Sequence, residues 1–480
     1  MRSLRKRIPF FIFCAIATLF AFLRLYKLDT SLEFFNDLGR DFLVMYDWQA
    51  TGKPPLLGPQ TSTIAFNQSA WYFYVLYPFY LLFSQSLFST TYAMLFYSLG
   101  LFAITYALIR MYASELTTSF FFFFFLSAVH PELVAQQRFV WNPSFVLPAL
   151  TVTLFGLFVL QKAWKSWLVW LVSAGMSFAI SMSYSAVPVL VGFFLSIGIL
   201  WRKRLLLFIV AFATSLLFWN APTIFFELRH NFLLTNMVTT RGSLPQMRSD
   251  IPSKLQAYGT YLFSTETVRS ASVMFSIFIL VLIVARTTIM SPWKKEFSMT
   301  SLILLGSLAA TLISPFDIQP HYIFPILTLI FGLVAFLPMP AAGVLVIGAA
   351  LYWLNPQHVL KYTEPALRTV KQIEHCAQTV CAQEKQPMFV SEQAGFHVFH
   401  TGPEYRFLFK KYGCDIRSIE TNPSLANRMA VVVDNSIYEH GKTAYNELTL
   451  FGPSTAKNKY VCEGNIQVVM LQKKDSYDPQ

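Results

Sequence analysis

The chain has 480 residues, of which 55% are hydrophobic and only 13% charged, and its mean hydropathy is +0.48. Soluble proteins carry about 25% charged residues, so this composition excludes a string of soluble domains and predicts a polytopic membrane protein. The formal net charge of +12 is interpreted first as a signal for topology, because Lys and Arg are enriched in the cytoplasmic loops of membrane proteins.

About eleven apolar runs have the length of a transmembrane helix. The first follows the basic segment Met1–Arg7 and is interpreted as an uncleaved helix, because no small-residue cleavage site follows it. The predicted spans cover approximately residues 8–25, 91–109, 111–130, 143–161, 167–182, 187–200, 205–226, 271–287, 298–315, 321–337 and 341–356.

For two stretches the number of membrane crossings is ambiguous, and the positions of the basic residues settle it. Lys162, Lys165 and Trp201–Arg204 should all be cytoplasmic, so the chain between them crosses the membrane an even number of times, which predicts two short helices broken at 183–185. The same parity makes the aromatic stretch Trp71–Phe88 an interfacial helix on the outer side. The N-terminus is thus predicted to be cytoplasmic and the C-terminus extracytoplasmic, in a protein of the cytoplasmic membrane.

Acidic residues concentrate at the predicted outer face. Before residue 357 only Glu115, at the cytoplasmic end of the run 111–130, and Glu296 fall on the cytoplasmic side, and no other acidic residue falls within a predicted span. Ion-coupled transporters carry ionisable residues at mid-membrane depth. The pattern therefore disfavours that class and indicates polar chemistry at the outer face.

Beyond Asn355–Pro356 the composition changes. Residues 357–480 alternate polar helical stretches with short apolar runs at Met388–Val390, Met429–Val433 and Ile466–Met470. This pattern predicts a small extracytoplasmic α/β domain of residues 357–480. It follows a transmembrane domain of residues 1–356, whose first outer loop is 26–90.

Four of the five cysteines lie in this C-terminal domain: Cys376, Cys381, Cys414 and Cys462. Outside the membrane an even number of cysteines is typical of disulfides, which predicts one or two of them. Free buried thiols are the alternative. A zinc site is a third possibility, for which the cysteine spacing is only a weak signal. Cys14 in the first helix is interpreted as a packing residue.

The first outer loop contains the segment Leu32–Trp48, which predicts a helix on the membrane surface with Asn36 as its N-cap. Asp37 and Asp41 lie four residues apart on one face, with Arg40 beside them. A carboxylate held near a cation could deprotonate an incoming hydroxyl group. The alternative is a helix start that merely favours acidic residues.

Further polar groups lie at predicted outer turns. Glu227, Arg229 and His230 end one span, Arg138 precedes another, and a third turn carries the pair His321 and Tyr322, so that the basic groups could bind a lipid phosphate. Taken singly, each is better explained as a snorkelling or loop residue. Several at one depth, opposite a carboxylate pair, favour a binding site.

The string Asn36–Asp41, the downstream Gly52–Gln60 and Trp71–Tyr74, the Phe226–His230 turn and the His321–Tyr322 pair resemble bacterial GT-C glycosyltransferases. The most similar groups are the protein O-mannosyltransferases and the aminoarabinose transferase-like enzymes of glycosyltransferase family 39. The resemblance covers residues 1 to about 356. It implies a polyprenyl-phosphate-linked sugar as donor and transfer, usually with inversion, to an acceptor hydroxyl on the outer face.

Matched to the family's motif, Asp37 takes the place of the catalytic Asp. Leu38 replaces the Glu that commonly follows it, and Asp41 is the candidate for that second acidic role. The resemblance makes Arg138, Arg229 and His230 candidates for binding the departing phosphate.

His321 and Tyr322 join these candidates for the donor phosphate, while Arg40, Glu227 and Tyr184 are expected to support the first loop. Related sequences often have a His-Tyr pair where this chain has Ser183–Tyr184.

The function predicted from these features is that of a glycosyltransferase with a lipid-linked donor and a lipid, protein or envelope-glycan acceptor. No nucleic-acid partner is expected. No convincing metal-ligand set is present, and nothing supports a divalent ion at Asp37 and Asp41. A lipid-linked glycan flippase and a glycan ligase or polymerase are the alternatives.

Overall fold

The computed structural model describes residues 2–61, 66–241, 250–263, 294–314, 318, 320–355, 358, 362–394, 401–439 and 446–474. By its internal contacts the chain divides into two compact units. The first, here called the helical unit, comprises Met1–Tyr26 and Pro55–Tyr362, and the second, the sheet unit, comprises Lys27–Pro54 and Thr363–Gln480. These units are defined by contacts alone. The division into a catalytic domain of 1–356 and an extracytoplasmic domain of 357–480 concerns function and location, and it stays a prediction.

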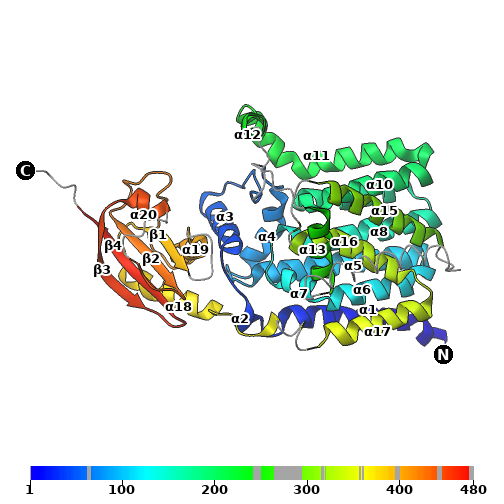
Figure 1. Ribbon diagram of the computed structural model, residues 1–480, viewed down its shortest axis with the longest axis horizontal. Helices are drawn as coiled ribbons and strands as arrows, with labels where there is room; N and C mark the ends of the chain where they lie inside the picture. Colours follow the sequence, from blue (N-terminus) through cyan, green and yellow to red (C-terminus); the bar gives the residue numbers. More distant parts are fainter. Residues whose placement is uncertain are drawn as a thin grey trace, which may run out of the picture. The chain divides into compact units, whose positions relative to one another are not determined.

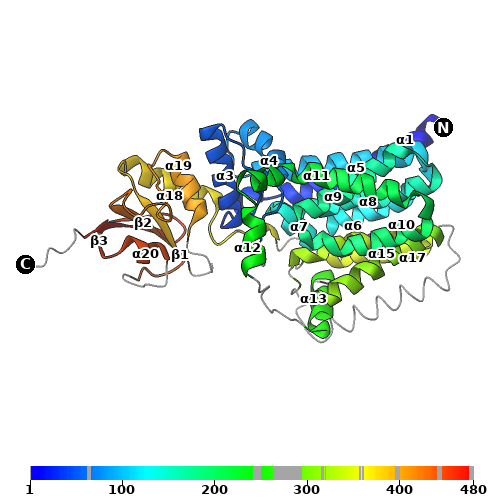
Figure 2. The ribbon, with the colours of Figure 1, turned by 90° about the horizontal axis from the view of Figure 1, so that it is seen from above.

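Apolar helices packed side by side form the helical unit (Figures 1 and 2). Their bounds are α1 (Arg2–Leu25), α4 (Trp71–Leu82), α5 (Ser89–Tyr112), α6 (Thr117–Val129), α7 (Pro131–Arg138), α8 (Val146–Lys162), α9 (Ser166–Met182), α10 (Val187–Leu200), α11 (Leu205–Arg229), α12 (Leu233–Arg241), α13 (Ile251–Phe263), α15 (Lys294–Ile313), α16 (Phe324–Ala335) and α17 (Met339–Trp353). Short 3-10 helices join several of them: η1 (Ser114–Leu116), η2 (Asn142–Phe145), η3 (Tyr184–Ala186), η4 (Arg202–Arg204) and η5 (Pro320–Ile323).

A helix lies at each predicted span except 271–287, which falls outside the described residues. Within the described part of the chain, 5 helices are long and apolar enough to cross a membrane, or 6 if the bent pair α6 and α7 counts as one span. Four further apolar helices, α9, α10, α16 and α17, are shorter. The chain is an integral membrane protein, while the predicted total of eleven spans is not established.

The aromatic stretch predicted as an interfacial helix forms α4. At 12 residues it is shorter than the ~20 residues that a bilayer crossing needs. Its inner face buries Tyr72, Phe73, Leu76 and Tyr80.

Polar contacts join helix ends and short connections at one end of the helical unit. Lys162 Nζ lies 3.1 Å from Glu296 and 3.7 Å from Glu115. The guanidinium of Arg204 lies 3.6 Å from the ring centre of Trp164. Segments that the basic residues predict to be cytoplasmic therefore meet at the same end.

A four-stranded sheet with the order β1-β2-β4-β3 forms the centre of the sheet unit (Figure 1). β1 pairs parallel with β2, whereas β2 with β4 and β4 with β3 are antiparallel. The strands are β1 (Phe389–Ala394), β2 (Arg428–Asp434), β3 (Ser454–Val461) and β4 (Ile466–Lys473), and the helices are α2 (Leu28–Ser31), α3 (Asp37–Thr51), α18 (Val370–Gln383), α19 (Pro403–Lys411) and α20 (Asn446–Phe451). The predicted apolar runs lie in β1, β2 and β4, which confirms the small α/β domain.

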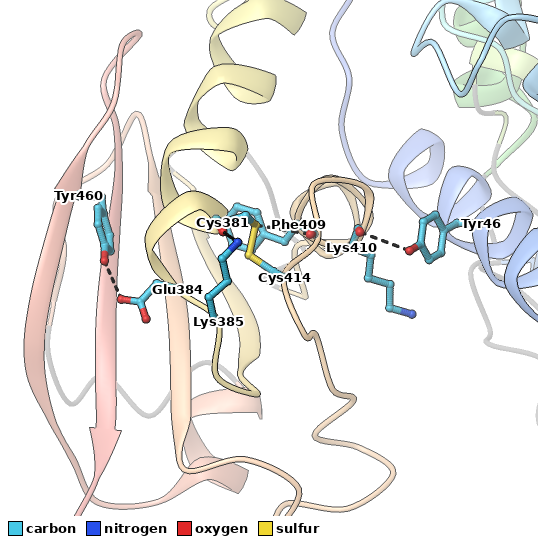
Figure 3. The surroundings of a disulfide bond; sticks show 8 residues. All are labelled: Tyr46, Cys381, Glu384, Lys385, Phe409, Lys410, Cys414 and Tyr460. Atoms are coloured by element: carbon cyan, nitrogen blue, oxygen red, sulfur yellow. Dashed lines mark hydrogen bonds between the residues drawn. A yellow bond between two sulfur atoms is a disulfide. The ribbon is translucent and has the colours of Figure 1, made fainter.

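Two disulfides link the helix α18 to other parts of the sheet unit. Cys376 pairs with Cys462 and Cys381 pairs with Cys414, whereas Cys14 is not disulfide-bonded. The second bond joins α18 to the chain just after α19 (Figure 3). The disulfide prediction is thereby confirmed, and the alternatives of free thiols and zinc are wrong for these four residues.

Candidate functional site

Asp37, Arg40 and Asp41 come together in the first turn of α3. Arg40 Nη1 lies 2.6 Å from Asp37 Oδ1, and its Nε and Nη2 donate to Asp41 Oδ1 at 2.9 and 2.8 Å. The Asp37 side chain is 34% exposed, while that of Asp41 is fully buried. One arginine therefore holds both carboxylates, but only Asp37 can reach a molecule from solution.

Asn36 stands at the N-cap position of α3, but its side chain makes no capping hydrogen bond, so that part of the prediction is wrong. Its backbone has φ 41° and ψ −102°, a sparsely populated region for a residue with a Cβ. The backbone N–H of Asn36 instead donates to Glu404 Oε2 at 3.2 Å. The backbone N–H at the start of α3 thus finds its hydrogen-bond acceptor in a side chain of α19.

A buried charged cluster surrounds Glu404. Arg368 donates from Nη2 to Glu404 Oε1 at 3.1 Å, and its Nε lies 2.6 Å from Asp434 Oδ2. The hydroxyl of Tyr405 accepts from Arg368 Nη1 and donates to Asp434 Oδ2, both at 2.9 Å. Glu392, in β1, lies 4.0 Å from the same guanidinium. Three carboxylates thus share one arginine.

Burial and the neighbouring charges shift these groups in a consistent direction. Burial, and the carboxyl of Glu404 beside it, raise the pKa of Glu392 well above its usual value. Burial also raises the pKa values of Glu404 and Asp434, although Arg368 opposes both shifts. Burial lowers the pKa of Arg368, but Tyr405 and the carboxylates outweigh it and raise that pKa overall.

The sequence carries no motif that identifies this cluster. The signal it offers is a charged residue inside or at the end of an apolar strand: Glu392 within β1 and Asp434 closing β2.

In the helical unit, Arg138 lies at the end of α7 and is 4% exposed. Its Nη1 donates to the carbonyl oxygens of Leu23, Arg24 and Tyr26 at 3.3, 3.1 and 2.9 Å. These carbonyls lie at the C-terminal end of α1. A cation there stabilises the helix, because it donates hydrogen bonds to unpaired carbonyls and interacts favourably with the helix dipole. Arg138 therefore caps α1.

A second buried arginine, Arg24, lies beside it, and no sequence motif points to it. Its guanidinium donates to Gln137 Oε1 at 2.8 and 2.9 Å and to the carbonyls of Ser127 and Ala128, at the end of α6. Both arginines thus bind helix-terminal carbonyls.

Glu227, Arg229 and His230 lie together at the end of α11. Glu227 accepts from the backbone N–H groups of Leu234 and Thr235 at 2.9 and 3.0 Å, so it caps α12. His230 is exposed, and its ring stacks on Phe226 with the ring centres 4.0 Å apart. Arg229 is exposed and forms no ion pair with another residue that the structure describes.

Tyr184 and Tyr322 lie on neighbouring turns of the helical unit, since η3 packs against η5. The hydroxyl of Tyr184 donates to the carbonyl oxygen of Asn67 at 3.0 Å, which ties η3 to the predicted first outer loop. Tyr322 is half-buried, and the side chain of His321 lies outside the described residues.

The predicted residues therefore fall into separate groups. Asp37, Arg40 and Asp41 form one cluster in the sheet unit, and Glu227, Arg229 and His230 form another in the helical unit. Arg138 is bound to α1. Among the described residues, no group of three or more His, Cys, Asp or Glu side chains could hold a metal ion.

No protein-family model matches the sequence, and no curated protein does. Solved structures do match. The chain is similar to ArnT from Cupriavidus metallidurans bound to undecaprenyl phosphate, with 12% identity, a TM-score of 0.63, and 95% of this chain and 97% of that chain covered.

The likeness extends to two larger proteins. The Archaeoglobus fulgidus oligosaccharyltransferase matches at 10% identity with a TM-score of 0.53, over 88% of this chain and 68% of that one. The arabinofuranosyltransferase AftD from Mycobacteria matches at 12% identity with a TM-score of 0.54, over 98% of this chain and 40% of that one. The chain has the GT-C fold of these membrane glycosyltransferases.

Proposed function

We propose that the chain is a glycosyltransferase that moves a sugar from a polyprenyl-phosphate-linked donor to an acceptor hydroxyl. The observation that carries the proposal is the likeness, over nearly the whole of both chains, to an enzyme solved with undecaprenyl phosphate. A second similar structure, an archaeal oligosaccharyltransferase, was solved with a dolichol-phosphate. The acceptor is a lipid, a protein or an envelope glycan.

In the proposed reaction Asp37 is the general base. Its carboxylate takes the proton of the acceptor hydroxyl, whose oxygen attacks the anomeric carbon as the bond to the phosphate oxygen breaks, which inverts that carbon. Asp37 suits this role because it is the exposed member of the carboxylate pair, while buried Asp41 serves to hold Arg40.

The leaving polyprenyl phosphate is an anion, so cationic groups stabilise it. Arg229 and His230 are proposed for this role, since both are exposed at the end of α11. His321 and Tyr322 remain proposed contributors. Arg138 acts in this proposal through its positive charge, because its Nη1 is already bound to the carbonyls of α1.

The proposed location is the cytoplasmic membrane, with the N-terminus cytoplasmic and the sheet unit extracytoplasmic. Two features support it: the predicted cytoplasmic loops meet at one end of the helical unit, and the sheet unit carries two disulfides. Disulfides persist mainly in oxidising compartments.

The test uses cells from which the gene has been deleted and which then receive a plasmid for the unaltered chain, for Asp37→Asn or for Glu33→Gln. Glu33 is an exposed carboxylate in the same loop and serves as the matched control. Mass spectrometry of glycolipids, glycoproteins and envelope polysaccharides should show one sugar modification that the unaltered chain and Glu33→Gln restore and Asp37→Asn does not.

Two results would count against the proposal. If Asp37→Asn restores the modification fully, Asp37 is not the base. If the purified protein moves a labelled undecaprenyl-phosphate sugar across liposomes and forms no glycosidic bond, the chain is a flippase.

A further inference from the structure

The helix that carries Asp37 packs, within the sheet unit, on a helix from the far end of the chain. We propose that α19 is the platform that holds α3 and sets the position of Asp37, and that Glu404 is a positioning residue for the sugar transfer. This inference rests on the function proposed above for Asp37. It gives the C-terminal segment an indirect part in catalysis, through the position of α3.

The first contact lies next to Asp37 in sequence. The backbone N–H of Asn36 donates to Glu404 Oε2 at 3.2 Å. A left-handed φ at a non-glycine residue costs about 1 to 3 kcal/mol and persists only where its surroundings hold it. Glu404 supplies such a constraint at the residue before Asp37.

Gly39 brings the two helices into close contact. A Cβ added at Gly39 would lie 2.3 Å from the backbone nitrogen of Glu404 and 2.5 Å from its Cα. No side chain fits there, so the first turn of α3 lies directly on the backbone of α19. Any larger residue at position 39 must move one helix away from the other.

Glu404 is itself held in place. Its side chain is 1% exposed, and its second carboxylate oxygen accepts from Arg368 at 3.1 Å. Arg368 is bound in turn to Asp434, the last residue of β2, at 2.6 Å. A continuous series of buried contacts therefore runs from the central sheet through Arg368 and Glu404 to the start of α3.

The rest of α3 is anchored on the same helix. The ring of Phe407 lies 5.2 Å from that of Phe42. The hydroxyl of Tyr46 donates to the carbonyl oxygen of Lys410 at 3.3 Å (Figure 3), and Lys410 Nζ lies 2.8 Å from Asp47 Oδ1. α19 thus contacts α3 at its first turn, its middle and its last turns.

This anchoring matters because a general base works only within hydrogen-bond distance of the proton it removes. A displacement of about 1 Å can lower a rate by about 100-fold. Since Asp37 lies in the first turn of α3, a loosened contact with α19 moves the carboxylate while leaving its chemistry unchanged.

Two adjacent lysines on α19 offer a matched pair of variants. Lys410 pairs with Asp47 of α3, and Lys411 pairs with Glu374 of α18, each at 2.8 Å. Turnover is measured on the full-length protein with radiolabelled undecaprenyl-phosphate sugars as donors and cell envelopes as acceptor. We expect Lys410→Ala to lower kcat about 3-fold, with the KM for the donor unchanged, and Lys411→Ala to leave both unchanged.

Glu404→Ala and Gly39→Ala act at the first turn. Each should lower kcat about 10-fold or more, with the KM for the donor unchanged. Hydrogen exchange of residues 37–51 should be faster in both and in Lys410→Ala, but not in Lys411→Ala. Where Glu404→Ala fails to fold, the pair of lysine variants decides the outcome alone.

The proposal is overturned if α3 exchanges faster in Lys410→Ala while kcat stays that of the unaltered chain, or if the two lysine variants behave alike. Asp37→Asn separates this failure from failure of the proposed function. If Asp37→Asn is active, Asp37 is not the base. If Asp37→Asn is inactive and the α19 variants have normal kcat, the function stands and only the platform is refuted.

Discussion

Removing the disulfide between Cys381 and Cys414 should destabilise the sheet unit by about 4 kcal/mol. The bond spans a sequence separation of 33, and closing a loop of that length restricts the unfolded chain by about 4 kcal/mol at 25 °C in the chain-entropy description. Both residues are buried, so alanine is the replacement of choice, because serine would bury hydroxyl groups. For a unit of about 150 residues this loss corresponds to a fall in Tm of about 10 °C.

The assay follows thermal unfolding of the full-length protein in detergent, read out by hydrogen exchange in the strands of the sheet unit. The control is the double alanine variant at Cys376 and Cys462, whose separation of 86 predicts a loss of about 5 kcal/mol. Both variants should unfold earlier than the parent. Only the Cys381 and Cys414 variant should also loosen α19 and lower sugar transfer at 25 °C, since that bond ends just after α19.

A fall of less than about 2 °C for either variant would refute the loop-closure reasoning. Equal loss of sugar transfer in the two variants would instead show that general stability, and not the anchoring of α19, limits the reaction.

Three more predictions concern single residues. Burial and Glu404 raise the pKa of Glu392, so the folded protein keeps a proton that the unfolded chain releases above about pH 4, and the contribution of this carboxyl to stability falls as the pH rises. Glu392→Gln should therefore raise Tm at pH 8 and hardly change it at pH 4. An equal shift of Tm at both pH values would contradict this. Glu227→Ala should lower the local stability of α12 by about 1 kcal/mol, which would appear as roughly 5-fold faster amide exchange in residues 233–241. Unchanged exchange would show that the cap does not stabilise α12. Arg138→Ala leaves buried carbonyls of α1 unpaired and should cost about 3 kcal/mol, measured as a lower Tm in detergent; a variant as stable as the parent yet inactive would favour direct phosphate binding.

The helix positions could be predicted because lipid imposes one rule on every span. A bilayer requires about 20 apolar residues in a helix, and that pattern is local in the sequence. Charge parity predicts the break at 183–185, and η3 lies there. The helix α3 was equally visible, since its buried residues Leu38, Phe42 and Met45 recur at helical spacing.

The contacts that complete the candidate site could not be predicted in the same way. Glu404 contacts Asn36 across 368 positions of sequence, and a single sequence holds no record of such a pairing. Arg138 binds backbone carbonyls, which every residue possesses and which leave no motif. Its basic charge predicts a phosphate ligand, whereas in the structure its side chain caps α1.

The assignment of Lys27–Pro54 to the sheet unit has a consequence for synthesis. α3 ends at Thr51 and α19 begins at Pro403, so at about 5 to 20 residues per second the first helix waits roughly 20 to 70 s for the second. During that interval the apolar face of α3 is without the helix on which it packs. A ribosome stalled before residue 411 leaves the helix that carries Asp37 without its partner, so the sheet unit can complete its folding only late in translation.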